Sequence, residues 1–148
     1  MPTTKAKAAK GTLVQRGDGG SPSETFTTIG EVNTFSGPQR TATVIDATSF
    51  DSTWEESILG VPVGGEVTLE CNLVGSNGQQ QGLETDYVNG TLRNFKIVLN
   101  DHATTKTTFS FSALVTALSV QGQGPNAKYV LNCTLKISGP TTVTYAPS

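Results

Sequence analysis

A chain of 148 residues has the length of one domain and can bury about 68–70% of its unfolded surface. Its 16 glycines, many threonines and few helix-favouring runs favour β-structure. The formal net charge of −2 argues against a general nucleic-acid-binding protein, and no apolar run approaches the roughly 20 residues that span a bilayer. The basic start, MPTTKAKAAKG, is not followed by an apolar segment, so we expect no secretory signal.

The first third of the sequence predicts an arm followed by short strands. Residues 1–11 are expected to form a flexible N-terminal arm before a domain over residues 12–140. TLVQRGDGGSP indicates a short strand that runs into a turn, because its glycines tolerate positive φ. TFTTIGEVNTF and RTATVIDATSF are β-rich runs separated by the turn sequence SGPQ.

The middle of the chain predicts a long irregular segment and then a regular strand. FDSTWEESILGVPVGG shows no clear periodicity over about sixteen residues, and such long loops are usually functional or disordered. GEVTLECNLVG alternates strictly, which predicts one inward and one outward face. The inward residues are Val67, Leu69, Cys71 and Leu73, and the outward residues are Glu66, Thr68, Glu70 and Asn72.

One helix is expected, over residues 77–89. Asn77 is placed to cap its start, and Gly90 suits the left-handed position after its end. Leu83 and Tyr87 are four residues apart and should share one face of the helix.

Three further segments complete the predicted sheet. Alternation directs a set of apolar residues inward: Phe95, Ile97, Leu99, Phe109, Phe111, Tyr129, Leu131, Cys133, Leu135 and Ile137. The parity changes near Ala113, before Leu114, Leu118 and Val120, which predicts a bulge or strong bend. The tail over residues 141–148 is either a last edge strand or an extended C-terminal arm. The sum is a mainly β fold, an antiparallel β-sandwich or barrel with one flanking α-helix.

The two cysteines, Cys71 and Cys133, fall on the inward parity of their strands. We expect buried, reduced thiols, with a disulfide between neighbouring strands as the alternative. They are far apart in sequence and His102 is the only histidine, so the sequence offers no metal site.

A search for catalytic groups leaves one weak candidate. His102, the only histidine available as a base, lies in a predicted turn between strands. Asp51 and Glu55 could converge on a helical turn as a glycosidase pair, but such clefts usually carry several aromatic residues and only Trp54 is near. We therefore expect no catalytic, cofactor-binding or metal-binding residues.

The charges are unevenly distributed along the chain. Residues 24–86 hold ten acids and a single base, Arg40, whereas residues 93–148 hold five bases and a single acid, Asp101. The first sixteen residues add four bases and no acid. Chance and solvated faces can explain this pattern, but so can a subunit whose acidic middle meets the basic ends of identical copies.

The order of these segments resembles the major tail tube proteins of bacteriophages with long, non-contractile tails. The resemblance covers about residues 11–143 and is strongest in VGGEVTLECNL and RNFKIVLN, with AKYVLNCTLKISGP similar to the last core strand of the family. It implies a β-sandwich with a flanking helix, assembled as six-fold rings that stack into a hollow tube for DNA. The tube protein of type VI secretion shares this fold, so a secretion tube is the first alternative function. A carboxylate-dependent glycan hydrolase is the second and less favoured alternative.

The resemblance also implies partners and a location. The chain would bind copies of itself, the tape measure protein, the tail terminator and tail tip proteins, while DNA passes through the lumen without specific binding. It would be assembled in the host bacterial cytoplasm and would reside in the virion tail. Residues 41–65 would be the long loop that reaches a neighbouring ring, and both chain ends would be arms on neighbouring subunits.

Within that loop, DSTWEES is interpreted as an interface with Trp54 as its anchor, since tryptophan is favoured at buried hot spots. The alternative is that Trp54 packs on its own core. The predicted interface residues are Asp51, Trp54, Glu55, Glu56, Ile58, Leu59, Lys5, Lys7 and Arg93. Glu66 and Glu70 would face either the lumen or the outer wall; the lumen is favoured because acids there would keep DNA mobile.

Overall fold

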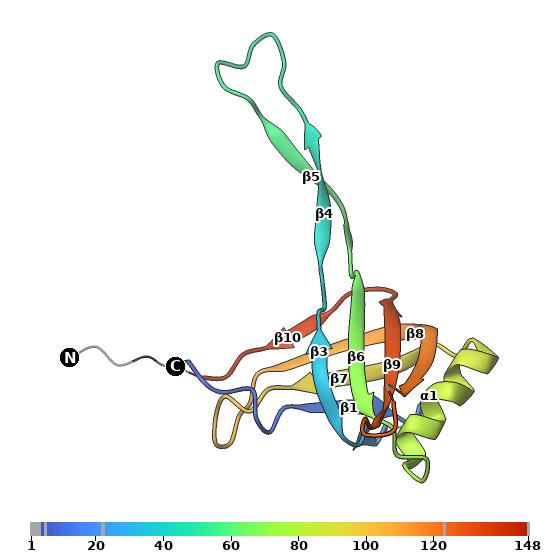
Figure 1. Ribbon diagram of the computed structural model, residues 1–148. Coiled ribbons are helices and arrows are strands. Elements are labelled where there is room, and N and C mark those ends of the chain that lie inside the picture. The colour runs from blue at the N-terminus through green and yellow to red at the C-terminus, as the bar shows by residue number, and fades with distance from the viewer. Residues whose placement is uncertain (1–3, 5, 22, 123, 148) are drawn as a thin grey trace.

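The computed structural model describes residues 4, 6–21, 23–122 and 124–147. Within them the chain forms ten strands and one helix (Figure 1). The elements are β1 (Leu13–Gly17), β2 (Phe26–Thr28), β3 (Val32–Ser36), β4 (Thr41–Asp46), β5 (Ser57–Val63), β6 (Glu66–Asn72), α1 (Gly78–Asn89), β7 (Arg93–Val98), β8 (Thr108–Gly122), β9 (Tyr129–Ile137) and β10 (Thr142–Thr144).

Eight of the strands form one antiparallel sheet that folds over on itself. Its order is β2-β1-β7-β8-β9-β6-β3, and β10 pairs with β8. The long strand β8 belongs to both halves, because residues 108–113 pair with β7 and residues 113–122 pair with β9. In Figure 1, β3, β6 and β9 run across β1, β7 and β8. This arrangement confirms a mainly β, antiparallel fold with one helix.

The core lies between the two halves of this sheet. It is formed by Val14, Ile29, Val67, Leu69, Cys71, Leu83, Phe95, Ile97, Phe111, Ala113, Val115, Leu131, Cys133, Leu135 and Ile137. The predicted alternation of β6, β7 and β9 is therefore confirmed in the middle of each strand. The prediction is wrong for Leu73 and Tyr129, which are exposed because they lie together at the outer end of the β6–β9 pair. Cys71 and Cys133 are buried free thiols, as expected.

The bend in β8 is present, but it lies beyond the predicted position. Phe111, Ala113 and Val115 keep one inward parity, and the register with β9 shifts between Val115 and Ala117. A bulge adds a residue to one strand and increases its local twist. The bulge therefore marks where β8 leaves the first half of the sheet, and Val120 beyond it is exposed rather than inward-facing.

Helix α1 begins and ends as its sequence predicts. The Asn77 side chain accepts hydrogen bonds from the backbone N–H groups of Gln79 and Gln80, and Gly90 adopts a left-handed conformation after the last turn. Its buried face carries Gln80, Leu83 and Asp86. The prediction that Tyr87 shares the packed face of Leu83 is wrong: Tyr87 is 49% exposed, and the inward position of that turn is taken by Asp86.

Asp86 connects the helix to two strands. Its carboxylate accepts hydrogen bonds from Arg16 on β1 and Arg93 on β7, with nitrogen–oxygen distances of 2.7–3.2 Å. The Asp86 side chain is fully buried, while those of Arg16 and Arg93 keep 13% and 17% exposure. The ion pairs therefore fix α1 against the first half of the sheet.

Strands β4 and β5 form a separate two-stranded sheet that projects from the body (Figure 1). The predicted irregular segment after Phe50 is thus wrong in its second half, because Ser57–Val63 is a strand. Periodicity failed here because consecutive apolar residues face both sides of an unsupported ribbon. The described residues near the two ends of the chain lie on another side of the body, where β10 pairs with β8 as in the edge-strand alternative for the tail.

Candidate functional site: the projecting hairpin

The hairpin formed by β4 and β5 exposes apolar side chains on both of its faces. Val44 lies opposite Leu59, and the next pair along the ribbon is Ile45 opposite Ile58. Residues directly opposite each other share a face and successive residues alternate, so these two pairs point to opposite sides. Leu59 is 72% exposed and Ile58 is 57% exposed. Both faces therefore lack a core to pack against in the single subunit.

Two adjacent glycines determine how the hairpin leaves the body. Gly65 has a φ of +77°, and a Cβ atom there would lie 1.9 Å from the backbone oxygen of Gln39. At Gly64 a Cβ atom would lie 2.5 Å from Ile137 in the core strand β9. Only glycine fits such close approaches between backbone and neighbour, so the sequence VGG holds the base of the hairpin against the sheet.

The tip of the hairpin is folded by its own polar groups. The backbone N–H of Glu56 donates to Thr48 Oγ1 at 2.8 Å, and Ser52 Oγ donates to Glu56 Oε2 at 2.7 Å. Asp46 accepts from the backbone N–H of Thr48, and hydrogen bonds with Thr48 lower the pKa of Asp46. These bonds give residues 47–56 a defined shape without covering the two aromatic side chains of the tip.

Those aromatic side chains are Phe50, which is fully exposed, and Trp54, which is 84% exposed. The alternative in which Trp54 packs on its own core is therefore wrong. Exposed aromatic and aliphatic side chains on one projecting element are characteristic of a surface that another molecule covers. Phe50, Val44 and Val61 were not among the predicted interface residues, although the position of Phe50 directly before the acidic loop was a signal that could have found it.

The structure brings together only part of the predicted interface. Asp51, Trp54, Glu55 and Glu56 lie in the tip, and Ile58 and Leu59 lie in β5 next to it. Lys7 is exposed near the chain ends, and Lys5 lies outside the described residues. Arg93 lies outside the hairpin, on β7, where its guanidinium is bound to Asp86 of its own chain.

The glycosidase alternative is not supported by this geometry. Asp51 and Glu55 are exposed in a hairpin tip that projects away from the body. A glycosidase needs two carboxyl groups that flank a sugar bond within a cleft.

Among the described residues, no three His, Cys, Asp or Glu side chains form a metal-binding group. No helix in the described ranges has the length and apolarity needed to span a bilayer.

Comparison with known proteins finds likeness in structure but not in sequence. No protein-family model and no curated protein matches the chain. A chain from the tail of an empty gene transfer agent particle, solved with C6 symmetry, superposes with a TM-score of 0.73 at 17% identity, covering 94% of this chain and 99% of that one. A chain from the six-fold symmetrised baseplate of the anti-feeding prophage gives 0.70 at 14% identity, covering 98% of both.

A third solved structure is the SPP1 tail tube, with a TM-score of 0.69 at 9% identity, covering 93% of this chain and 78% of that one. The three structures belong to tail or baseplate assemblies, and the likeness extends over nearly the whole described chain. Identities this low carry information on fold alone. The fold that this chain shares with them is the tail tube fold.

Proposed function

We propose that the chain is a structural, non-catalytic subunit of a phage-type tail tube, in which six copies form a ring and rings stack through the projecting hairpin. The observation that carries this proposal is the hairpin with apolar side chains exposed on both faces. An isolated two-stranded hairpin is marginally stable in water, so this one needs partners on each side. Stacked rings of identical subunits provide such partners.

The free edges of the sheet support the same proposal. Strands β2 and β3 end the main sheet, and β10 pairs only with β8. Exposed strand edges promote uncontrolled pairing in monomers, and a closed ring converts them into contacts between neighbours. The similar structures that were solved with six-fold symmetry support six copies in each ring.

In our proposal, the charge of the surface that lines the lumen determines whether DNA can pass through the tube. Glu66 and Glu70 lie on the outward face of β6, with Lys136 opposite Glu66 and Asn132 opposite Glu70. This face carries few positive charges, and a lining that does not bind phosphates would let DNA pass. Such a tube would conduct DNA into the host from a virion tail assembled in the bacterial cytoplasm. It would adjoin a tape measure protein, a tail terminator and tail tip proteins.

The placement of the lumen is tested with Glu66→Lys combined with Glu70→Lys. Tubes should still form, because both side chains face away from the core, but DNA release from virions should slow. Normal DNA release from virions with the double substitution would contradict the placement.

A second candidate function is the tube of a protein-injecting or secretion machine. It is favoured by the likeness to the anti-feeding prophage baseplate and to the sheath–tube complex of an extracellular contractile injection system. Purified particles distinguish the two functions: DNA in the particle supports the phage tail, and a contractile sheath around a tube loaded with protein supports the injection machine.

The stacking role is tested with one substitution on each face of the hairpin, Leu59→Asp and Ile58→Asp. Each should abolish tube formation without lowering the melting temperature, because neither side chain packs on the core. Val88→Asp, at an apolar residue of α1 that is 69% exposed and lies outside the hairpin, is the matched control and should assemble. Loss of assembly in only one variant would indicate a hairpin covered on a single face, and normal tubes in both would overturn the proposal.

A further inference from the structure

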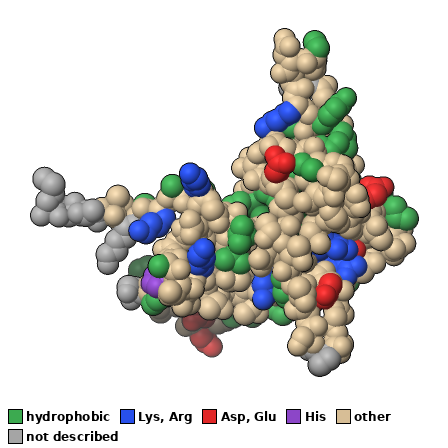
Figure 2. Space-filling view, turned by 90° about the horizontal axis from the view of Figure 1, so that it is seen from below, with side chains coloured by type: hydrophobic (Ala, Val, Ile, Leu, Met, Phe, Trp, Pro, Cys, Tyr) green, Lys and Arg blue, Asp and Glu red, His purple; other side chains and the backbone are tan. Residues whose placement is uncertain are grey.

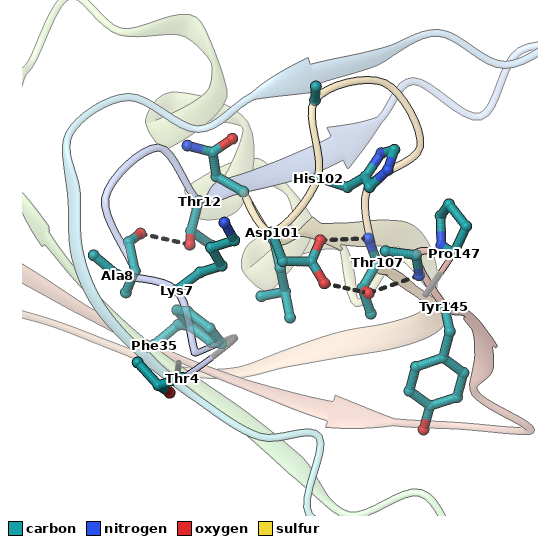
Figure 3. Close-up of a pocket in the computed structure, with 15 residues that line it drawn as sticks. Thr4, Lys7, Ala8, Thr12, Phe35, Asp101, His102, Thr107, Tyr145 and Pro147 are labelled. Atoms are coloured by element: carbon teal, nitrogen blue, oxygen red, sulfur yellow. Dashed lines mark hydrogen bonds between the residues drawn. The ribbon is translucent and has the colours of Figure 1, made fainter. Parts of the chain in front are cut away.

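A second feature of the surface is a cavity of about 840 Å³ between the two ends of the chain (Figure 3). Its walls come from four segments that are distant in sequence: the N-terminal arm, strand β3, the loop between β7 and β8, and the tail after β10. Phe35 and Leu99, both packed against the core, and Tyr145 line it with apolar surface. A cavity of this size and lining accommodates large aromatic side chains.

Hydrogen bonds hold these walls in place. Thr107 donates to Asp101 through both its backbone N–H and its hydroxyl, and its Oγ1 accepts from the backbone N–H of Ala146 at 3.0 Å. The hydrogen bonds from Thr107 lower the pKa of Asp101. Asn100 donates to the backbone oxygen of Lys10 at 3.0 Å. The loop between β7 and β8 is thus tied to both ends of the chain.

The charge around this cavity is mainly positive. Lys7 lines it, and Lys10 and Lys106 are next in sequence to the lining residues Ala9 and Thr107. Asp101, the acid among the lining residues, is already engaged by Thr107. Figure 2 shows basic side chains around the base of the N-terminal arm and near the purple side chain, which is His102. The cavity therefore combines an apolar floor with lysines on, or directly next to, the segments that line it.

The side chains of the hairpin tip are complementary to this cavity in polarity and charge. It presents the exposed side chains of Phe50 and Trp54 together with the exposed acids Asp51, Glu55 and Glu56. Figure 1 shows the tip far from the chain ends, so it does not enter the cavity of its own chain. The groove at the hairpin base, lined by Arg40, Pro62 and Ile137 among others, has no aromatic side chain among its lining residues to receive such a tip.

We propose that the terminal cavity receives the hairpin tip of a second copy of this chain, with Trp54 seated against Phe35, Leu99 and Tyr145 and the acids of the tip facing Lys7 and Lys10. The inference rests on the proposed function, because it names the surface to which the hairpin binds. Complementary charges would orient the tip, and the aromatic contact would hold it. The uneven charge distribution along the sequence then follows from this docking.

Disulfide cross-linking tests the docking directly. The native cysteines are buried, so engineered surface cysteines are the reactive ones. Thr53→Cys places a thiol beside Trp54, and Ala103→Cys places one in the cavity wall without removing a larger side chain. The matched control pairs Thr53→Cys with Ala127→Cys, which is exposed in the turn between β8 and β9. Both double variants are oxidised after assembly and separated on a non-reducing gel.

The expected result is a ladder of linked chains for the cavity pair and monomers for the control pair. Tubes that form normally without cross-links at Ala103, or with equal cross-linking at Ala127, would overturn the docking and leave the tube function intact. Cross-links at Ala103 in protein that forms no tubes would support the docking and contradict the tube function. Absence of both tubes and cross-links would overturn the docking together with the function.

Discussion

At the scale of single residues, the two thiols show how burial controls reactivity. Desolvation raises the pKa of Cys71 to about 11 and that of Cys133 to about 12. At pH 8 about one in a thousand of such thiols, or fewer, is the reactive thiolate. Labelling of native protein with a thiol reagent at pH 8 should therefore be very slow, and denaturation should expose two reactive groups. Rapid labelling of native protein, or a disulfide formed without added oxidant, would contradict this prediction.

Asp86 is the residue whose burial was hardest to foresee. Its position on α1 is separated from Arg16 by 70 residues, so only the tertiary fold brings the two together. Desolvation alone would raise the pKa of Asp86, but hydrogen bonds from Arg16 and Arg93 outweigh it and lower the pKa below its usual range. Ionised Asp86 therefore stabilises the folded state, and this contribution is fully present at pH values above the pKa of an unfolded Asp, about 3.9. That contribution is lost as pH falls through the lower folded value.

Asp86→Asn should lower the free energy of unfolding by about 3 kcal/mol near neutral pH, because it leaves two partly buried arginines without their counter-charge. The difference from wild type should stay constant above about pH 5 and shrink below about pH 4. Urea denaturation at several pH values measures it. Glu84→Gln, an exposed acid on the same helix, is the control and should change stability by less than about 0.5 kcal/mol. An Asp86→Asn effect that is independent of pH down to pH 3 would refute the role of its charge.

At the scale of elements, regular alternation and helix caps made much of the fold predictable. Val67, Leu69 and Cys71 alternate because one side of β6 faces the core, and Asn77 and Gly90 bound a helix through local hydrogen bonds. Strand β5 was not predictable in this way, because Ile58 and Leu59 are both apolar and both exposed. Its partner surface belongs to another molecule in our account, so the pattern of a single chain does not contain it.

The glycine at the hairpin base gives a test at this scale. Gly65→Ala should lower the free energy of unfolding by about 1–3 kcal/mol, because a Cβ atom at φ +77° would meet the oxygen of Gln39. Gly78→Ala is the control: a Cβ atom there meets nothing within 4 Å, and alanine favours the helix by about 0.4–1 kcal/mol. Chemical denaturation compares the two variants. Equal stability for Gly65→Ala and wild type would show that the hairpin base is free to rearrange.

The tip of the hairpin is tested through Trp54. Trp54→Ala should leave the melting temperature close to that of wild type, because the side chain makes no core contact in the single subunit. Loss of a buried hot-spot tryptophan costs about 2–4 kcal/mol for each contact, so the concentration needed for tube formation should rise at least about 30-fold. Trp54→Phe keeps an aromatic ring and should retain most assembly. If Trp54→Ala unfolds the subunit, the residue belongs to the fold and its interface role is wrong.

At the scale of the whole molecule, a closed body and an open hairpin have separate roles. The body buries a continuous core and could be predicted from the sequence as a mainly β fold with one helix. The sequence located the loop in which Trp54 and its acidic neighbours are exposed, but it could not show that Arg93 is bound to Asp86 of its own chain. Local patterns identify an unusual loop, but which charges remain available depends on contacts that form only after folding.

The central claim is that this chain stacks as six-fold rings through its hairpin, and electron microscopy of the purified protein tests it most directly. Rotational averages of single rings and helical averages of any tubes give the symmetry and the density at the hairpin. The account predicts six-fold rings that stack into hollow tubes, with the hairpin of each subunit in contact with the adjacent ring. Monomers that remain dispersed at high concentration, or assemblies in which the hairpin stays exposed to solvent, would contradict it.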